Sequence, residues 1–186
     1  MYRKLPLYFI IGGSPTLGKD SFEAIWNGFQ SLKDIFLKDP YALETLHISV
    51  IQVSSDAWSI TPLTPINSWR PPVLYPEGTG ELAFGAAIKI LDNRISQDVI
   101  PASTAFKGDF CPLIFILVSS PPTDDWINVT KSVLNRTNPH LASCLTLLVG
   151  SDVKPSDFEQ VPGLNPVILN NNTRGLVSHF ISWVDQ

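Results

Sequence analysis

The sequence predicts an α/β protein with a doubly wound, mostly parallel central sheet, one antiparallel edge strand, and helices on both faces. Short apolar runs alternate with amphipathic helical patterns along the whole chain. Most of the runs consist almost entirely of Ile, Leu, Val and Phe, which is typical of strands covered on both faces. The order is strand, helix, strand, strand, and then repeated helix–strand units, which favours a doubly wound topology.

Six segments are expected to form strands. The third of them is more polar than the others, so we expect it at an edge of the sheet. In chain order they are Leu5–Ile11, Leu46–Val53, Ala57–Leu63, Leu113–Val118, Cys144–Val149 and Pro166–Leu169.

Four segments carry apolar residues at helical spacing. The first helix is expected to end near Lys38-Asp39-Pro40, and the last to begin at about Thr173. Thr123 is expected to cap the third helix, with Asp124 and Asp125 favouring its positive end. The four stripes are Phe22, Ile25, Phe29, Leu32 and Phe36; Phe84, Ile88, Leu91 and Ile95; Trp126, Val129 and Val133; and Leu176 or Val177, Phe180 and Val184.

The bulk composition predicts one globular domain over residues 1–186. A hydrophobic share of 44% with 16% charged residues excludes a disordered chain. The net charge of −4 argues against binding to nucleic acid or an anionic membrane, which would require a basic surface. No apolar run reaches the roughly 20 residues of a membrane-spanning helix, and the first residues show no signal-peptide pattern. We therefore expect a cytoplasmic protein.

Two cysteines and two long connections complete the outline. Cys111 and Cys144 are expected to be small buried hydrophobes rather than a disulfide or a pair of metal ligands. The connection Thr64–Gly80 contains four prolines, and Ser96–Asp109 is polar. Long loops in compact domains often carry function, although proline can equally indicate rigid surface packing.

The turn Gly12-Gly13-Ser14-Pro15-Thr16 follows the first predicted strand. Open α/β sheets bind their ligands at the carboxyl ends of their strands. This turn offers the hydroxyls of Ser14 and Thr16, and the strand Leu113–Val118 ends in Ser119-Ser120. The expected site can form hydrogen bonds, but it lacks the negative charge that holds a hard cation.

The segment Gly13–Lys19 is close to a phosphate-binding P-loop and lies between a strand and a helix. The residue after the lysine is Asp20, where the motif needs a Ser or Thr to bind magnesium. Nucleotide binding is therefore a weak alternative. None of the three histidines (His47, His140 and His179) is expected near Ser14, so we predict no catalytic triad and no enzymatic activity.

Several segments along the chain form a pattern that is specific when they are taken together, although each is weak alone. They are Leu5–Ile11 entering the Ser14 turn, Asp39–Thr45, Pro71-Pro72 before Gly78-Thr79, Phe84-Gly85-Ala86-Ala87, and Pro122–Trp126. On these segments, over about residues 4–185, the chain resembles a von Willebrand factor type A (VWA) domain, specifically the bacterial TerY-like branch found with tellurium-resistance genes.

The resemblance implies a metal-ion-dependent adhesion site of the pattern Asp-x-Ser-x-Ser, followed by a distant Thr and a distant Asp. The first Asp corresponds to Gly12 in this sequence, the two serines correspond to Ser14 and Thr16, the Thr is best matched by Thr79, and the last Asp corresponds to Ser119. Both acids are missing, and magnesium is normally held through one or two carboxylates. We therefore expect a degenerate site with no metal and no cofactor.

The same resemblance implies a scaffold that binds protein partners, which are kinase-like or phosphatase-like in TerY-like systems. Two alternatives stay open: a Mg²⁺- or Mn²⁺-dependent module in which Asp20, Glu77 or Glu81 compensates for the missing acids, and a nucleotide-binding switch that uses Gly13–Lys19. Aromatic residues beside the site can act as partner anchors or pack in the core; they are Trp58, Trp69 and Tyr75.

Overall fold

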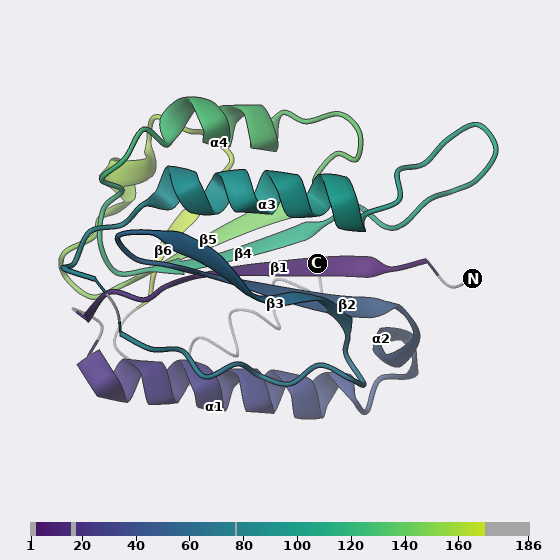
Figure 1. Cartoon of the computed structure of the whole chain (residues 1–186), viewed down its shortest axis with the longest axis horizontal. Helices are drawn as coiled ribbons and strands as arrows, with labels where there is room; N and C mark the ends of the chain where they lie inside the picture. Colours follow the sequence, from purple (N-terminus) through teal and green to yellow (C-terminus); the bar gives the residue numbers. More distant parts are fainter. Residues whose placement is uncertain (1–2, 16–17, 77, 170–186) are drawn as a thin grey trace.

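The computed structural model describes residues 3–15, 18–76 and 78–169. They form a six-stranded sheet in the order β3-β2-β1-β4-β5-β6, with α1 on one face and α3 and α4 on the other (Figure 1). All neighbouring strands are parallel except β2 and β3. The predicted fold class, including its single antiparallel edge strand, is confirmed.

All six predicted strands are present, with small differences at their ends. The strands are β1 (Leu5–Gly12), β2 (Leu46–Val53), β3 (Ala57–Pro65), β4 (Leu113–Val118), β5 (Ser143–Val149) and β6 (Pro166–Leu169). The helices are α1 (Gly18–Phe36), α2 (Pro40–Thr45), α3 (Phe84–Asp98), α4 (Ile127–Leu134) and the 3₁₀ helix η2 (Pro155–Phe158).

The central strand β1 divides the core into two layers. Successive side chains of a strand point to opposite faces, so Tyr8 and Ile10 join the layer under α3, whereas Leu7 and Phe9 join the layer under α1. All four are buried. The continuous apolar run is explained by this two-sided burial.

The predicted apolar stripes of α1 and α3 face the sheet. Phe29 of α1 meets Phe9 edge to face, with 5.1 Å between ring centroids. In α3 the whole predicted stripe is buried. The short helix α2 begins where Asp39 Oδ1 accepts hydrogen bonds from the N–H groups of Tyr41 (2.8 Å) and Ala42 (3.3 Å).

The predicted helix cap at Thr123 is wrong. Helix α4 begins at Ile127 with Trp126 at its N-cap position. The Thr123 hydroxyl instead donates to the Leu82 carbonyl and accepts from the Leu82 N–H, each at 3.2 Å. Long-range pairing of this segment with the residues before α3 therefore takes the place of a local cap. The helix expected from Thr173 lies outside the described residues.

Within those described ranges, no helix is both long enough and apolar enough to cross a membrane.

Candidate binding site at the carboxyl edge of the sheet

Two glycines, Gly12 at the end of β1 and Gly13 directly after it, lie against neighbouring strands. A Cβ on Gly12 would lie 3.3 Å from the carbonyl oxygen of Leu117 and 3.3 Å from Cα of Val118 in β4. The Gly13 N–H donates to the Val53 carbonyl at 2.6 Å. Because this N–H group is already paired, it does not point at a phosphate as a P-loop amide does. Thr16 and Leu17, in the middle of the near-P-loop, lie outside the described residues.

The carboxyl ends of the parallel strands lie on one side of the sheet, which we call the carboxyl edge. Three of the predicted site residues lie there. Ser14 follows β1 and Ser119 follows the adjacent parallel strand β4, and both are buried. Thr79 is exposed, and its neighbour Gly78 lies beside Ser55 in the turn after β2, because a Cβ on Gly78 would be 3.0 Å from the Ser55 hydroxyl. The structure thus gathers Ser14, Thr79 and Ser119 at one edge of the sheet.

Ser120, directly after Ser119, supplies a further hydroxyl to which the sequence analysis assigns no role. It is 5% exposed, and its Oγ has no hydrogen-bond partner among the described residues. An unpaired buried hydroxyl favours a polar ligand or an ordered water at the same position.

Gln52 is a second residue that sequence reasoning missed. It is 2% exposed in β2, and its Nε2 donates to the Tyr75 carbonyl at 2.6 Å. Its amide nitrogen also fills the space where a Cβ on Gly13 would stand. A glutamine beside apolar neighbours near the end of a predicted buried strand is the signal available in the sequence, because a buried amide needs a partner.

The carboxylates of this edge form a rim around its hydroxyls. Asp20, Asp56, Glu81, Asp125 and Asp152 are all exposed in the segments that follow β1, β2, β4 and β5 or precede α3. Glu77 lies outside the described residues. The predicted lack of carboxylates therefore applies to the positions of Ser14, Thr79 and Ser119, which we call the floor. The exposed acidic residues of the surrounding segments form what we call the rim.

The carboxylate of Asp124, near the floor, is already hydrogen-bonded to the backbone. Asp124 accepts hydrogen bonds from the N–H groups of Gly85 (2.9 Å) and Ala86 (3.0 Å). The described residues contain no group of three or more His, Cys, Asp or Glu side chains that could hold a metal ion. Neutral hydroxyls beside Gly12 do not fit the ligand needs of Mg²⁺, so no chemical step through a metal follows from this donor set.

The three predicted aromatic anchors differ in exposure. Trp69 is fully buried and meets Phe29 edge to face, with 5.7 Å between ring centroids, so of the two alternatives core packing applies to it. The segment that carries it folds back over α1, which places the indole in the core. Trp58 is half-buried on β3, and Tyr75 is 62% exposed.

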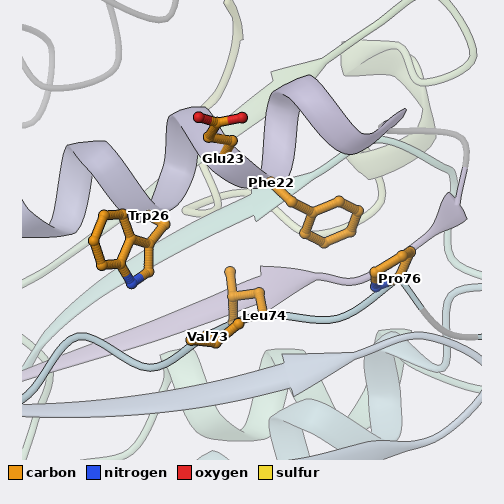
Figure 2. Close-up of a pocket in the computed structure, with 6 residues that line it drawn as sticks. All are labelled: Phe22, Glu23, Trp26, Val73, Leu74 and Pro76. Atoms are coloured by element: carbon orange, nitrogen blue, oxygen red, sulfur yellow. The ribbon is translucent and has the colours of Figure 1, made fainter.

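The connection after β3 forms one wall of an apolar pocket. We call residues 66–76 the strap; it runs along α1 (Figure 1). Between the strap and α1 lies a pocket of about 470 Å³ (Figure 2). Phe22, Glu23 and Trp26 line it from α1, and Val73, Leu74 and Pro76 line it from the strap.

Three of the apolar lining residues are exposed, namely Trp26, Val73 and Pro76. Val73 is 57% exposed and Trp26 is 37% exposed, and both face the pocket region in Figure 2. Trp26 lies next to the predicted stripe of α1 rather than on it, which explains why the sequence pattern did not place it in a site. Phe22 lies in the second turn of α1, so this end of the pocket is the one nearer to Ser14 and the carboxyl ends of the strands.

The histidines lie away from Ser14, as far as the described chain extends. His47 begins β2 and His140 precedes β5, so both lie at the amino edge. His179 is outside the described residues. Cys144 is buried as predicted, whereas Cys111 is half-buried beside His140.

Comparisons with known proteins identify the fold alone. No protein-family profile and no curated protein match the chain. Among solved structures, a von Willebrand factor type A protein from Catenulispora acidiphila gives a TM-score of 0.68 at 12% identity, covering 97% of this chain and 42% of that one. Proximal thread matrix protein 1 from the mussel byssus gives 0.67 at 11% identity, covering 99% and 48%.

A third structure is similar in length to this chain. BatB from Bacteroides thetaiotaomicron gives a TM-score of 0.62 at 12% identity, covering 98% of this chain and 100% of that one. The chain spans less than half the length of the other two. Taken with the sheet order and the layered helices, these similarities show that the chain has the VWA fold.

Proposed function

We propose that this chain is a non-enzymatic protein-binding module that acts as a scaffold in a bacterial, cytoplasmic TerY-like stress or chemical-defence system, with kinase-like or phosphatase-like partners. The observation that carries the proposal is the apolar pocket between α1 and the strap, beside the carboxyl edge. Clustered, accessible apolar side chains with a tryptophan are typical of surfaces that bury a partner's side chain.

The charge of the neighbouring edge indicates the chemistry of the partner. Among the described residues, the segments 12–15, 18–20, 54–56, 78–83, 119–126 and 150–157 hold seven Asp or Glu residues and two Lys residues, Lys19 and Lys154. An acidic rim favours a partner surface rich in Lys and Arg, because complementary potentials speed association and select partners. We infer that an apolar side chain flanked by basic residues enters the pocket.

The floor of the edge supports recognition without a metal. Ser14, Thr79 and Ser119 supply hydroxyls, and no acid occupies the positions of Gly12 and Ser119. The zinc-occupied adhesion site named for the mussel protein belongs to that protein. A ligand that binds only the folded chain raises its melting temperature. The proposal therefore expects Mg²⁺, Mn²⁺ and ATP each to leave the melting temperature unchanged.

Affinity capture from cells of the source organism tests the proposal, with Trp26→Ala as the pocket variant. Phe106→Ala is a matched control, because Phe106 is also an exposed aromatic (53%). It lies in the loop between α3 and β4, at the amino ends of the strands and away from the pocket. We expect a defined partner with the native chain and with Phe106→Ala, at least tenfold less with Trp26→Ala, and release by about 0.5 M salt.

Three results would contradict the proposal. Equal capture by native chain and Trp26→Ala would remove the pocket from the interaction. A rise in melting temperature with ATP would instead favour the nucleotide switch, and a rise with Mg²⁺ or Mn²⁺ alone would favour the metal-dependent module.

A further inference from the structure

Cys111 and His140 lie together at the amino edge of the sheet, opposite the proposed partner surface. Cys111 precedes β4 and His140 precedes β5, two parallel neighbours in which Leu113 is opposite Ser143. The two lead-in segments are also joined directly, because the Ala142 N–H donates to the Pro112 carbonyl at 2.9 Å.

The geometry of the pair allows proton transfer. Cys111 Sγ lies 3.2 Å from Nε2 of His140 and 3.8 Å from Nδ1. A neutral imidazole nitrogen at this position can accept the thiol proton, which leaves a thiolate beside an imidazolium. The thiolate, and not the thiol, is the nucleophile in cysteine chemistry.

Solvent reaches this pair. Cys111 is half-buried and His140 is exposed. The other cysteine, Cys144, is buried in β5, and burial raises the pKa of its thiol to about 12. Both cysteines are free, so the chain holds one accessible thiol beside a base and one inert thiol for comparison.

Sulfur and imidazole also bind metals, so a metal site is the competing interpretation. Structural zinc sites use four protein ligands, and catalytic ones use three. In the described part of the chain, no third His, Cys, Asp or Glu joins this pair in a group that could hold an ion. Covalent thiol chemistry is therefore the better fit.

We propose that Cys111, activated by His140, is a modification site that forms mixed disulfides with low-molecular-weight disulfides of the glutathione type. His140 Nε2 takes the proton from Sγ, and the Cys111 thiolate attacks one sulfur of the disulfide. The sulfur–sulfur bond of the reagent breaks as the new one forms. The departing thiolate takes the proton from the imidazolium, so one disulfide is consumed, one is made, and no other oxidant is needed.

The test measures reaction with oxidised glutathione at pH 7, with the adduct located by peptide mass mapping. We expect one adduct per chain, at Cys111. His140→Ala should lower the rate about tenfold or more, because the thiolate loses its partner cation and the thiol its base. His47→Ala is the matched control: His47 also lies at the amino edge, where its ring contacts the Thr45 carbonyl, and this variant should react at the native rate.

Three results would overturn the proposal: equal rates for the native chain and His140→Ala, an adduct at Cys144, or a native rate no faster than that of N-acetylcysteine. The last comparison needs no variant, so it decides the question even if His140→Ala misfolds. The site lies at the edge opposite the pocket, so its test is independent of partner capture.

Discussion

Asp124 accepts a hydrogen bond from the backbone N–H of Gly85 at 2.9 Å, so the segment after β4 caps the first turn of α3. The N-cap residue of α3, Ala83, has no side chain able to do this. Gly85 permits the close approach, since a Cβ there would lie 2.8 Å from the Asp125 carbonyl oxygen. The cap thus ties the sheet's carboxyl edge to the helix beside it.

Asp124→Ala is expected to destabilise the protein by about 1–2 kcal/mol, as other lost helix caps do. The melting temperature should fall by about 2–4 °C for each kcal/mol in a chain of this size. Thermal unfolding followed by circular dichroism measures the change. Asp125→Ala removes an exposed neighbouring carboxylate and should cost less than about 0.5 kcal/mol; equal losses from both variants would show that Asp124 is not a cap.

The contact between Gly13 and Gln52 gives a second prediction. Gly13→Ala pushes its new methyl group into the Gln52 amide, which must move away from the Tyr75 carbonyl. We expect a loss of about 1–3 kcal/mol in the free energy of unfolding, measured by urea denaturation.

A double-mutant cycle identifies the cause. In Gly13→Ala/Gln52→Ala the shorter side chain makes room for the methyl group, so the combined loss should be smaller than the sum of the single losses by 0.5 kcal/mol or more, on the order of other contacting pairs. Strict additivity would rule out this contact as the source of the loss.

The elements that the sequence predicted well depend on local patterns. Strands β1 and β4 are nearly continuous apolar runs, and the stripes of α1 and α3 repeat at helical spacing, so burial in two layers follows from the sequence itself.

The missed features depend on contacts between distant segments. The sequence pattern predicts that Asp124 acts at the helix that follows it, whereas its partner is the earlier helix α3. The pocket joins Trp26 to Val73 only because the strap folds back over α1, and the same fold buries Trp69 against Phe29. No local sequence pattern predicts that the strap folds back over α1.

Tyr8 provides a prediction about pH. Burial first, and the nearby Asp98 carboxylate second, raise the pKa of Tyr8 above its ordinary value of 10.0. In the unfolded chain Tyr8 ionises near its ordinary value while the folded chain keeps it protonated. Its contribution to stability is therefore complete below about pH 10 and declines as pH rises further toward the folded-state pKa.

Tyr8→Phe should remove that alkaline decline. The Tyr8 hydroxyl is buried without a hydrogen-bond partner among the described residues, so its removal should also stabilise the protein by about 1 kcal/mol at pH 7. Urea midpoints at pH 7 and pH 10.5 measure both effects. A variant that is less stable at pH 7 and declines with the native slope would contradict this account of the Tyr8 environment.

The missing acids of the carboxyl edge can be restored by Gly12→Asp with Ser119→Asp. If Ser14 and the two new carboxylates converge, Mn²⁺ or Mg²⁺ at about 100 times its dissociation constant should stabilise the variant by about 2.7 kcal/mol while leaving the native chain unchanged. Without metal the variant should melt below the native chain, because a Cβ on Gly12 meets the Leu117 carbonyl oxygen and Val118 Cα at 3.3 Å and the two carboxylates repel.

Differential scanning fluorimetry with and without each cation measures this restoration. Gly12→Asn with Ser119→Asn is the matched control, because it adds similar volume without negative charge. If charge is what the edge lacks, the Asn variant loses stability without metal and recovers none with it. A double Asp variant indifferent to both cations would show that Gly12 and Ser119 do not correspond to the acids of an adhesion site. Metal-dependent stabilisation of the native chain would instead mean that the exposed acids of the rim compensate for them.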